Sequence, residues 1–143
     1  MLSFHISIHA RSAEVTEGKD VKLDRGEFRS LAVPQVALAT PFQTSFEEAG
    51  AALAKLDRMF FEPDGSFVWT SSAQSTWQVD GNLFDRNGRL LFVDLKGSCP
   101  SEQFDRLLSA LGWPATPMMF QLVREAVFLD EAEFRRYADS GVK

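Results

Sequence analysis

Several kinds of residue and segment are scarce in this sequence, and each scarcity excludes a class of protein. Cys99 is the only cysteine among 143 residues, so no disulfide can form within the chain. A reducing compartment is the simplest setting for such a chain. No run approaches the ~20 apolar residues of a membrane-spanning helix, and the N-terminus lacks the basic and apolar blocks of a signal peptide. We therefore expect a cytoplasmic protein.

Positive charge is neither abundant nor clustered. The chain has 15 Lys and Arg against 20 Asp and Glu, a formal net charge of −5, and its longest basic run is Arg135-Arg136. Nucleic-acid-binding proteins normally carry a clustered basic footprint, and an acidic surface disfavours anionic membranes. We expect neither nucleic acid nor membrane as a partner.

The common catalytic and cofactor motifs are also missing. The sequence contains no Gly-x-Gly-x-x-Gly, Walker loop, Gly-x-Ser-x-Gly, His-Glu-x-x-His or zinc-ligand spacing. The only histidines, His5 and His9, fall on one face of an expected strand. There they would lie about 13 Å apart at ~3.3 Å per residue, which is too far to share a metal ion. We predict no cofactor and no metal.

Apolar aromatic residues are the abundant component. The chain has 13 Phe and 3 Trp against a single Tyr, and 45% of its residues are hydrophobic. This composition is typical of a globular protein with a largely aromatic core. Because 143 residues is the length of one ordinary domain, we predict a single domain over residues 1–143.

The first half of the chain predicts strands followed by one helix. Period-two alternation predicts a strand over residues 2–9. A small hairpin around residues 17–20 and a strand region over 28–40, in which Pro34 favours an edge position or a bulge, come next. The helix spans residues 45–60, with Thr44 or Ser45 as its N-cap.

The second half predicts a three-stranded meander and two further helices. The strands cover residues 66–72, 76–85 and 89–96, and a three-residue turn containing Gly88 would pair Asp85 with Arg89. A helix follows Cys99, taken as its N-cap, and another follows Asp130. Residues 118–129 favour one strand or two short strands, and a helix from Pro117 is the alternative.

These elements predict an α+β fold, in which an antiparallel β-meander sheet has about three α-helices packed against it, plus N-terminal strands. The order of elements after residue 44 is helix, three strands, helix, one or two strands and helix. That order resembles the small secretion-chaperone type of α+β domain. The resemblance rests on element order alone, and it implies a domain that dimerises and holds segments of partner proteins.

Cys99 is the first candidate for chemistry. A thiol at a helix N-cap faces unpaired amides and the positive end of the helix dipole, which favour the reactive thiolate. The plainer interpretation is that a small residue fits between a strand end and a helix.

Asp80 and Asp94 are the second candidate. The predicted turn places these carboxylates directly opposite each other, where like charges destabilise a sheet. The pair could bind a cation or act as acid and base. Alternatively, solvent and the neighbouring Lys96 relieve the repulsion on a solvated sheet face.

Four apolar residues are candidates for binding a partner: Trp69, Phe84, Leu90 and Phe92. A sheet that is apolar on both faces must be covered on both, and three helices need not cover both completely. A remaining apolar patch would be a partner surface or a dimer interface. The alternative is that the helices and the N-terminal segment cover everything.

The leading hypothesis is a non-enzymatic module that binds a protein partner or a second copy of itself. The alternative is a small-molecule-binding domain or an enzyme that uses Cys99 or the Asp80/Asp94 pair. A structural subunit of a larger assembly is the third possibility.

Overall fold

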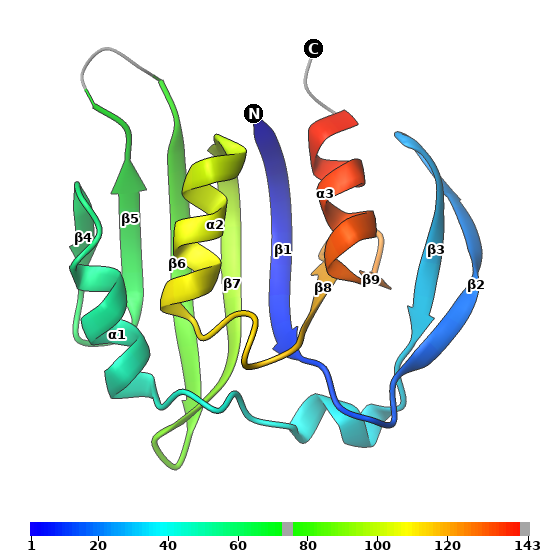
Figure 1. Ribbon diagram of the computed structural model, residues 1–143, viewed down its shortest axis with the longest axis horizontal. Coiled ribbons are helices and arrows are strands. Elements are labelled where there is room, and N and C mark those ends of the chain that lie inside the picture. Colours follow the sequence, from blue (N-terminus) through cyan, green and yellow to red (C-terminus); the bar gives the residue numbers. More distant parts are fainter. Residues whose placement is uncertain (73–75, 141–143) are drawn as a thin grey trace.

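The computed structural model describes residues 1–72 and 76–140 and has a seven-stranded antiparallel sheet at its centre (Figure 1). The strand order is β4-β5-β6-β7-β1-β8-β9, and a separate two-stranded sheet pairs β2 with β3. In chain order the elements are β1 (Leu2–Ala10), β2 (Thr16–Leu23), β3 (Gly26–Ala32), a 3-10 helix η1 (Gln35–Ala39), α1 (Phe46–Ala54), β4 (Met59–Phe61), β5 (Ser66–Thr70), β6 (Gln78–Arg86), β7 (Arg89–Cys99), α2 (Ser101–Ala110), β8 (Met118–Leu122), β9 (Val127–Leu129) and α3 (Glu131–Ser140). The predicted fold class is confirmed, and residues 118–129 form two strands.

β1 joins the two halves of the large sheet, although it is the first strand of the chain. It pairs with β7 from Leu2 to His9, and with β8 only from Ile6 onwards. Its even-numbered residues, from Leu2 to Ala10, are all buried, as the period of two predicts. Every second residue of β1 therefore points into the main core.

All three α-helices lie on the same face of this sheet (Figure 1). A cluster of Phe rings anchors two of them, because Phe104 of α2 and Phe134 of α3 have their ring centroids 5.4 Å apart. Phe4 of β1 lies 5.3 Å from Phe104, and Phe120 of β8 lies 4.8 Å from Phe134. Full burial of each such ring contributes about 1.5–3 kcal/mol. The excess of Phe thus fills the space between helices and sheet.

Helix ends follow the capping signals in two of the three helices. The Ser45 hydroxyl accepts a hydrogen bond from the Glu48 backbone at 3.0 Å, and the Glu48 carboxylate accepts one from the Ser45 backbone at 3.0 Å. The Asp130 carboxylate likewise accepts from the Glu133 backbone at 2.8 Å. These caps pair amide groups that the first helical turn leaves without partners, and they confirm both predicted starts.

The predicted helix over residues 45–60 is too long. α1 ends at Ala54, and Arg58 then adopts a left-handed conformation with φ +62°. Phe60 therefore belongs to the edge strand β4, where it pairs with Val68 of β5. The apolar spacing was compatible with a longer helix. It could not indicate that Arg58, a residue other than glycine, adopts a left-handed conformation and ends the helical run.

Two predictions near the N-terminus are also wrong. The β2–β3 hairpin closes at Asp24-Arg25 instead of at residues 17–20. After β3, Pro34 starts the 3-10 helix η1 where the sequence predicted continued strand. Proline offers no ladder donor, so the strand ends before it.

The β6–β7 hairpin has the predicted alternation of faces but not the predicted register. Arg86 pairs with Arg89 around a two-residue turn, in which Asn87 and Gly88 have φ of +55° and +83°. A bulge then leaves Leu91 out of the ladder, and all later pairs are displaced by two residues from the prediction. A shift of two residues keeps the side chains beyond the bulge on their predicted faces. Leu90, between the turn and the bulge, is the exception, because it is buried in the main core on the helix side.

The hairpin register makes Gly97 sensitive to substitution. Gly97 has φ +142°, and a Cβ there would lie 2.1 Å from the carbonyl oxygen of Gln78 across the ladder. We expect Gly97→Ala to lower the free energy of unfolding in urea by about 2–4 kcal/mol through strain and overpacking. Gly88→Ala is the matched control, because Gly88 has φ +83° but no atom within 4 Å, and it should cost about 1–2 kcal/mol. Equal losses of unfolding free energy in Gly97→Ala and Gly88→Ala would contradict this register.

Candidate functional site

The face of the sheet opposite the helices carries the polar and aromatic side chains that the sequence singled out. Among the described residues, no α-helix lies against this face (Figure 1). We call the part of it over β4, β5, β6, β7 and β1 the open face. Cross-strand pairing arranges its side chains in three rows, because paired residues share a face.

The first row runs across five neighbouring strands as Phe60, Val68, Asp80, Lys96 and His5. Its apolar end is accessible, with Phe60 65% and Val68 37% exposed. Asp80 stands opposite Lys96, so a carboxylate faces an ammonium group across the ladder. The row therefore joins an exposed apolar pair to a charged pair.

The second row corrects the predicted carboxylate pair. Asp94 pairs with Asn82 on one side and with Ser7 on the other, while Asp80 lies in the first row. The two carboxylates do not stand opposite each other, because the two-residue turn and the bulge together displace the register by two residues. Both line one shallow cavity of about 170 Å³ together with Lys96, which is smaller than the ~300 Å³ of typical small-molecule sites.

The third row consists of aromatic and apolar side chains: Phe84, Phe92, His9 and Met119. Phe84 and Phe92 stack with ring centroids 4.5 Å apart and are half-buried. Met119, at the other end, is fully buried in a second small core with residues of β3 and η1. The third row therefore begins at the half-exposed Phe84–Phe92 stack and ends at the buried Met119.

His9 lies at the border between these two regions. Its ring stacks on Phe92 at 5.4 Å and meets the edge of Phe128 at 5.6 Å, and its Nε2 lies 3.1 Å from the Ser7 hydroxyl. The His9 Nδ1 atom is buried without a hydrogen-bond partner in the described part of the chain. Burial lowers the pKa of His9, and the nearby Asp94 carboxylate opposes that shift.

Two of the four predicted partner-binding residues are in the core. Trp69 is 2% exposed, donates its indole N–H to the carbonyl of Asp57 at 2.9 Å, and meets Trp77 edge-on. Leu90 is fully buried, because the bulge beside it turns its side chain to the helix side, and its carbonyl accepts from the Phe42 amide at 2.8 Å. The structure places only Phe84 and Phe92 of the predicted set on the open face.

Cys99 is not placed for nucleophilic chemistry. It is the last residue of β7, pairs with Leu2 of β1 and is fully buried, while Pro100 takes the N-cap position of α2. Burial raises the pKa of the Cys99 thiol to about 12, which keeps it protonated at neutral pH. The prediction of an N-cap thiol is wrong because β7 extends to Cys99, three residues beyond the predicted end of the strand.

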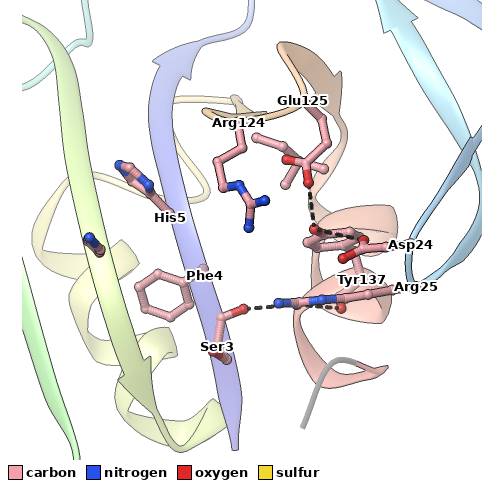
Figure 2. Close-up of a pocket in the computed structure, with 10 residues that line it drawn as sticks. Ser3, Phe4, His5, Asp24, Arg25, Arg124, Glu125 and Tyr137 are labelled. Carbon is pink, nitrogen blue, oxygen red and sulfur yellow. Dashed lines mark hydrogen bonds between the residues drawn. The ribbon is translucent and has the colours of Figure 1, made fainter.

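A separate cavity of about 310 Å³ lies between β1, the β2–β3 turn, the β8–β9 turn and α3 (Figure 2). Nη1 of Arg25 donates to the carbonyl oxygens of Ser3 and Tyr137, both at 3.2 Å. The Tyr137 hydroxyl lies 3.3 Å from a Glu125 carboxylate oxygen. No sequence pattern predicted this cavity, because its residues come from turns about 100 positions apart and form no local motif.

Comparison with protein-family models, curated proteins and solved structures gave no match. Within residues 1–72 and 76–140, none of the helices has the length and apolar character needed to cross a membrane. The same part of the chain holds no cluster of three His, Cys, Asp or Glu side chains that could bind a metal ion. The open face and the cavity are therefore the two candidate functional sites.

The half-buried His9 predicts loss of stability in mild acid. Unfolded His9 takes up a proton near its ordinary pKa of 6.5, whereas folded His9 does so only at lower pH. The unfolded state then binds more protons, so this contribution to stability falls as the pH drops below about 6.5. We expect His9→Phe to reduce the difference in urea midpoint between pH 7 and pH 5.

The matched control for this experiment is His5→Gln, since His5 is exposed on the same strand and face and has none of the ring contacts of His9. This variant should keep the acid sensitivity of the parent chain. If His9→Phe kept the acid sensitivity as well, the His9 ring would not be its source.

The buried Cys99 predicts a slow thiol. Alkylation of the folded protein by iodoacetamide at pH 7 should be at least roughly a hundredfold slower than in 8 M urea, because both access and the thiolate are lost on folding. Mass spectrometry of timed samples measures both rates. A folded-state rate similar to that in urea would restore Cys99 as a catalytic candidate.

Proposed function

We propose that this chain is a non-enzymatic interaction module that binds a second copy of itself through the open face. The observation that carries the proposal is the first row, in which exposed Phe60 and Val68 lie on the same uncovered face as Asp80 and Lys96. Neighbouring exposed apolar side chains that form a contiguous patch often mark an interaction site.

The charges of the open face support a second copy as the partner. A two-fold interface brings the same surface of both copies together, so it requires a surface that complements itself. The open face carries the carboxylates of Asp80 and Asp94 beside the ammonium group of Lys96. Antiparallel apposition can place Lys96 of each copy against carboxylates of the other, with Phe84 and Phe92 adding aromatic contact area.

The catalytic alternative has less support. Cys99 is buried and protonated at neutral pH, and Asp80 and Asp94 do not form the opposed pair that acid–base chemistry would use. The proposal keeps the cytoplasmic location, which the single cysteine favours, and it does not invoke nucleic acid.

Self-association should depend on the exposed apolar residues of the first row. We expect sedimentation velocity across a concentration series to show a monomer–dimer equilibrium. Phe60→Lys should weaken it about tenfold or more, because it removes apolar contact and adds like charges across the two-fold axis.

Val36→Lys is the matched control, because Val36 is 68% exposed but lies on η1, outside the three rows. It makes the same change in charge and should leave the dimer constant within about twofold. A wild-type chain that stays monomeric at every concentration would overturn the proposal, as would equal effects of the two variants.

A further inference from the structure

The cavity in Figure 2 occupies a gap in the large sheet. β8 pairs with β1 only from Ile6 onwards, and the last backbone contact between this segment and β1 is the Val123 amide donating to the His5 carbonyl at 3.1 Å. Beyond that point Arg25 spans the gap, since it bonds the carbonyls of Ser3 on β1 and Tyr137 on α3. The side chain of Arg25 thus forms one wall of a preformed space.

Arginine side chains converge on this space from two turns. Arg124 projects its guanidinium between β1 and Tyr137, toward Arg25 (Figure 2). In the described part of the chain, Arg124 makes no hydrogen bond or ion pair, and Arg25 bonds only backbone oxygens through one of its nitrogens. Each guanidinium has five N–H donors, so most of the donors around the cavity remain available.

The acidic residues of the cavity are directed at Tyr137. Glu125 and Asp24 lie 3.3 Å and 3.5 Å from its hydroxyl, and Figure 2 shows them on the α3 side of the space. The cavity wall also includes Lys96, so three fixed cations face two carboxylates. A local positive surplus stands out in a chain whose net charge is −5.

We propose that this cavity binds a small carboxylate or phosphate anion, with Arg124 and Arg25 as its main ligands. Guanidinium groups bind both anions through paired, charge-assisted hydrogen bonds. The volume of about 310 Å³ is at the lower end of the range for small-molecule sites. The anion is either a free small molecule or the C-terminal carboxylate of another chain. This site goes beyond the proposed self-association and does not depend on it.

Calorimetric titration with citrate and with inorganic phosphate, at constant ionic strength set by NaCl, tests the proposal. We expect saturable binding that Arg124→Ala weakens about tenfold or more, because a charge-assisted contact is lost. Arg86→Ala is the matched control, since Arg86 is equally exposed but lies at the β6–β7 turn, away from the cavity. It should change the affinity less than about twofold, as expected for screened long-range charge.

Glu125→Gln adds a test of the opposite sign. Removing a carboxylate from the cavity wall should tighten anion binding severalfold. Equal weakening by Arg124→Ala and Arg86→Ala would overturn the site, because the binding would then reflect overall charge.

Two hexapeptides that differ only in a C-terminal carboxylate or amide distinguish the source of the anion. Binding of citrate or phosphate alone identifies a free anion, and binding of the carboxylate peptide but not its amide identifies a chain terminus. Absence of saturable binding by all four probes overturns the proposal. Phe60 does not line the cavity, so Phe60→Lys should change these affinities less than about twofold even where it dissociates the dimer. Lys96 belongs to both the open face and the cavity wall, but the main ligands, Arg124 and Arg25, lie outside the open face.

Discussion

The pairing of β1 with both β7 and β8 is the constraint on which the rest of the structure depends. Because the first strand lies inside the sheet, its alternating residues define two surfaces. The even-numbered residues fill the core beneath the helices, and the odd-numbered ones, such as His5 and His9, continue the rows of the opposite face. Where β8 stops pairing at Ile6, the same strand leaves the gap that Arg25 spans. The open face and the cavity therefore have one structural origin.

The two faces of the large sheet are covered to different extents, and this difference determines which face is accessible to a partner. Among the described residues, the α-helices pack on one face only, and the small core of β3, η1 and Met119 covers the β8–β9 corner of the other. An antiparallel sheet can expose one face to water when that face is polar. Here the exposed rows mix Phe60 and Phe84 with the Asp80/Lys96 pair, so the surface combines apolar contact area with charges of both signs.

Local patterns predicted the elements but not their pairing partners. The capping signal at Ser45 and the alternation of β1 depend on neighbouring residues, and both were predicted correctly. The turn was correctly located at Asn87-Gly88, but it has two residues instead of the predicted three. The bulge at Leu91 depends on long-range contacts, because the carbonyl of Leu90 bonds a segment far earlier in the chain. The two-residue turn and that bulge together moved the Asp80 and Asp94 partners. The cavity forms only because turns that are distant in the sequence lie close together in the fold, so no sequence pattern predicted it.

Hydroxyl-radical footprinting across a dilution series tests the central claim, that the open face is the contact surface, most directly. Radicals modify exposed aromatic side chains, and mass spectrometry reports each residue separately. The account predicts that Phe60, Phe84 and Phe92 become protected as concentration rises, while Trp113, a half-buried residue outside the open face, keeps a constant rate. Unchanged modification of all three Phe residues in a chain shown to dimerise would contradict it, because another surface would then form the contact.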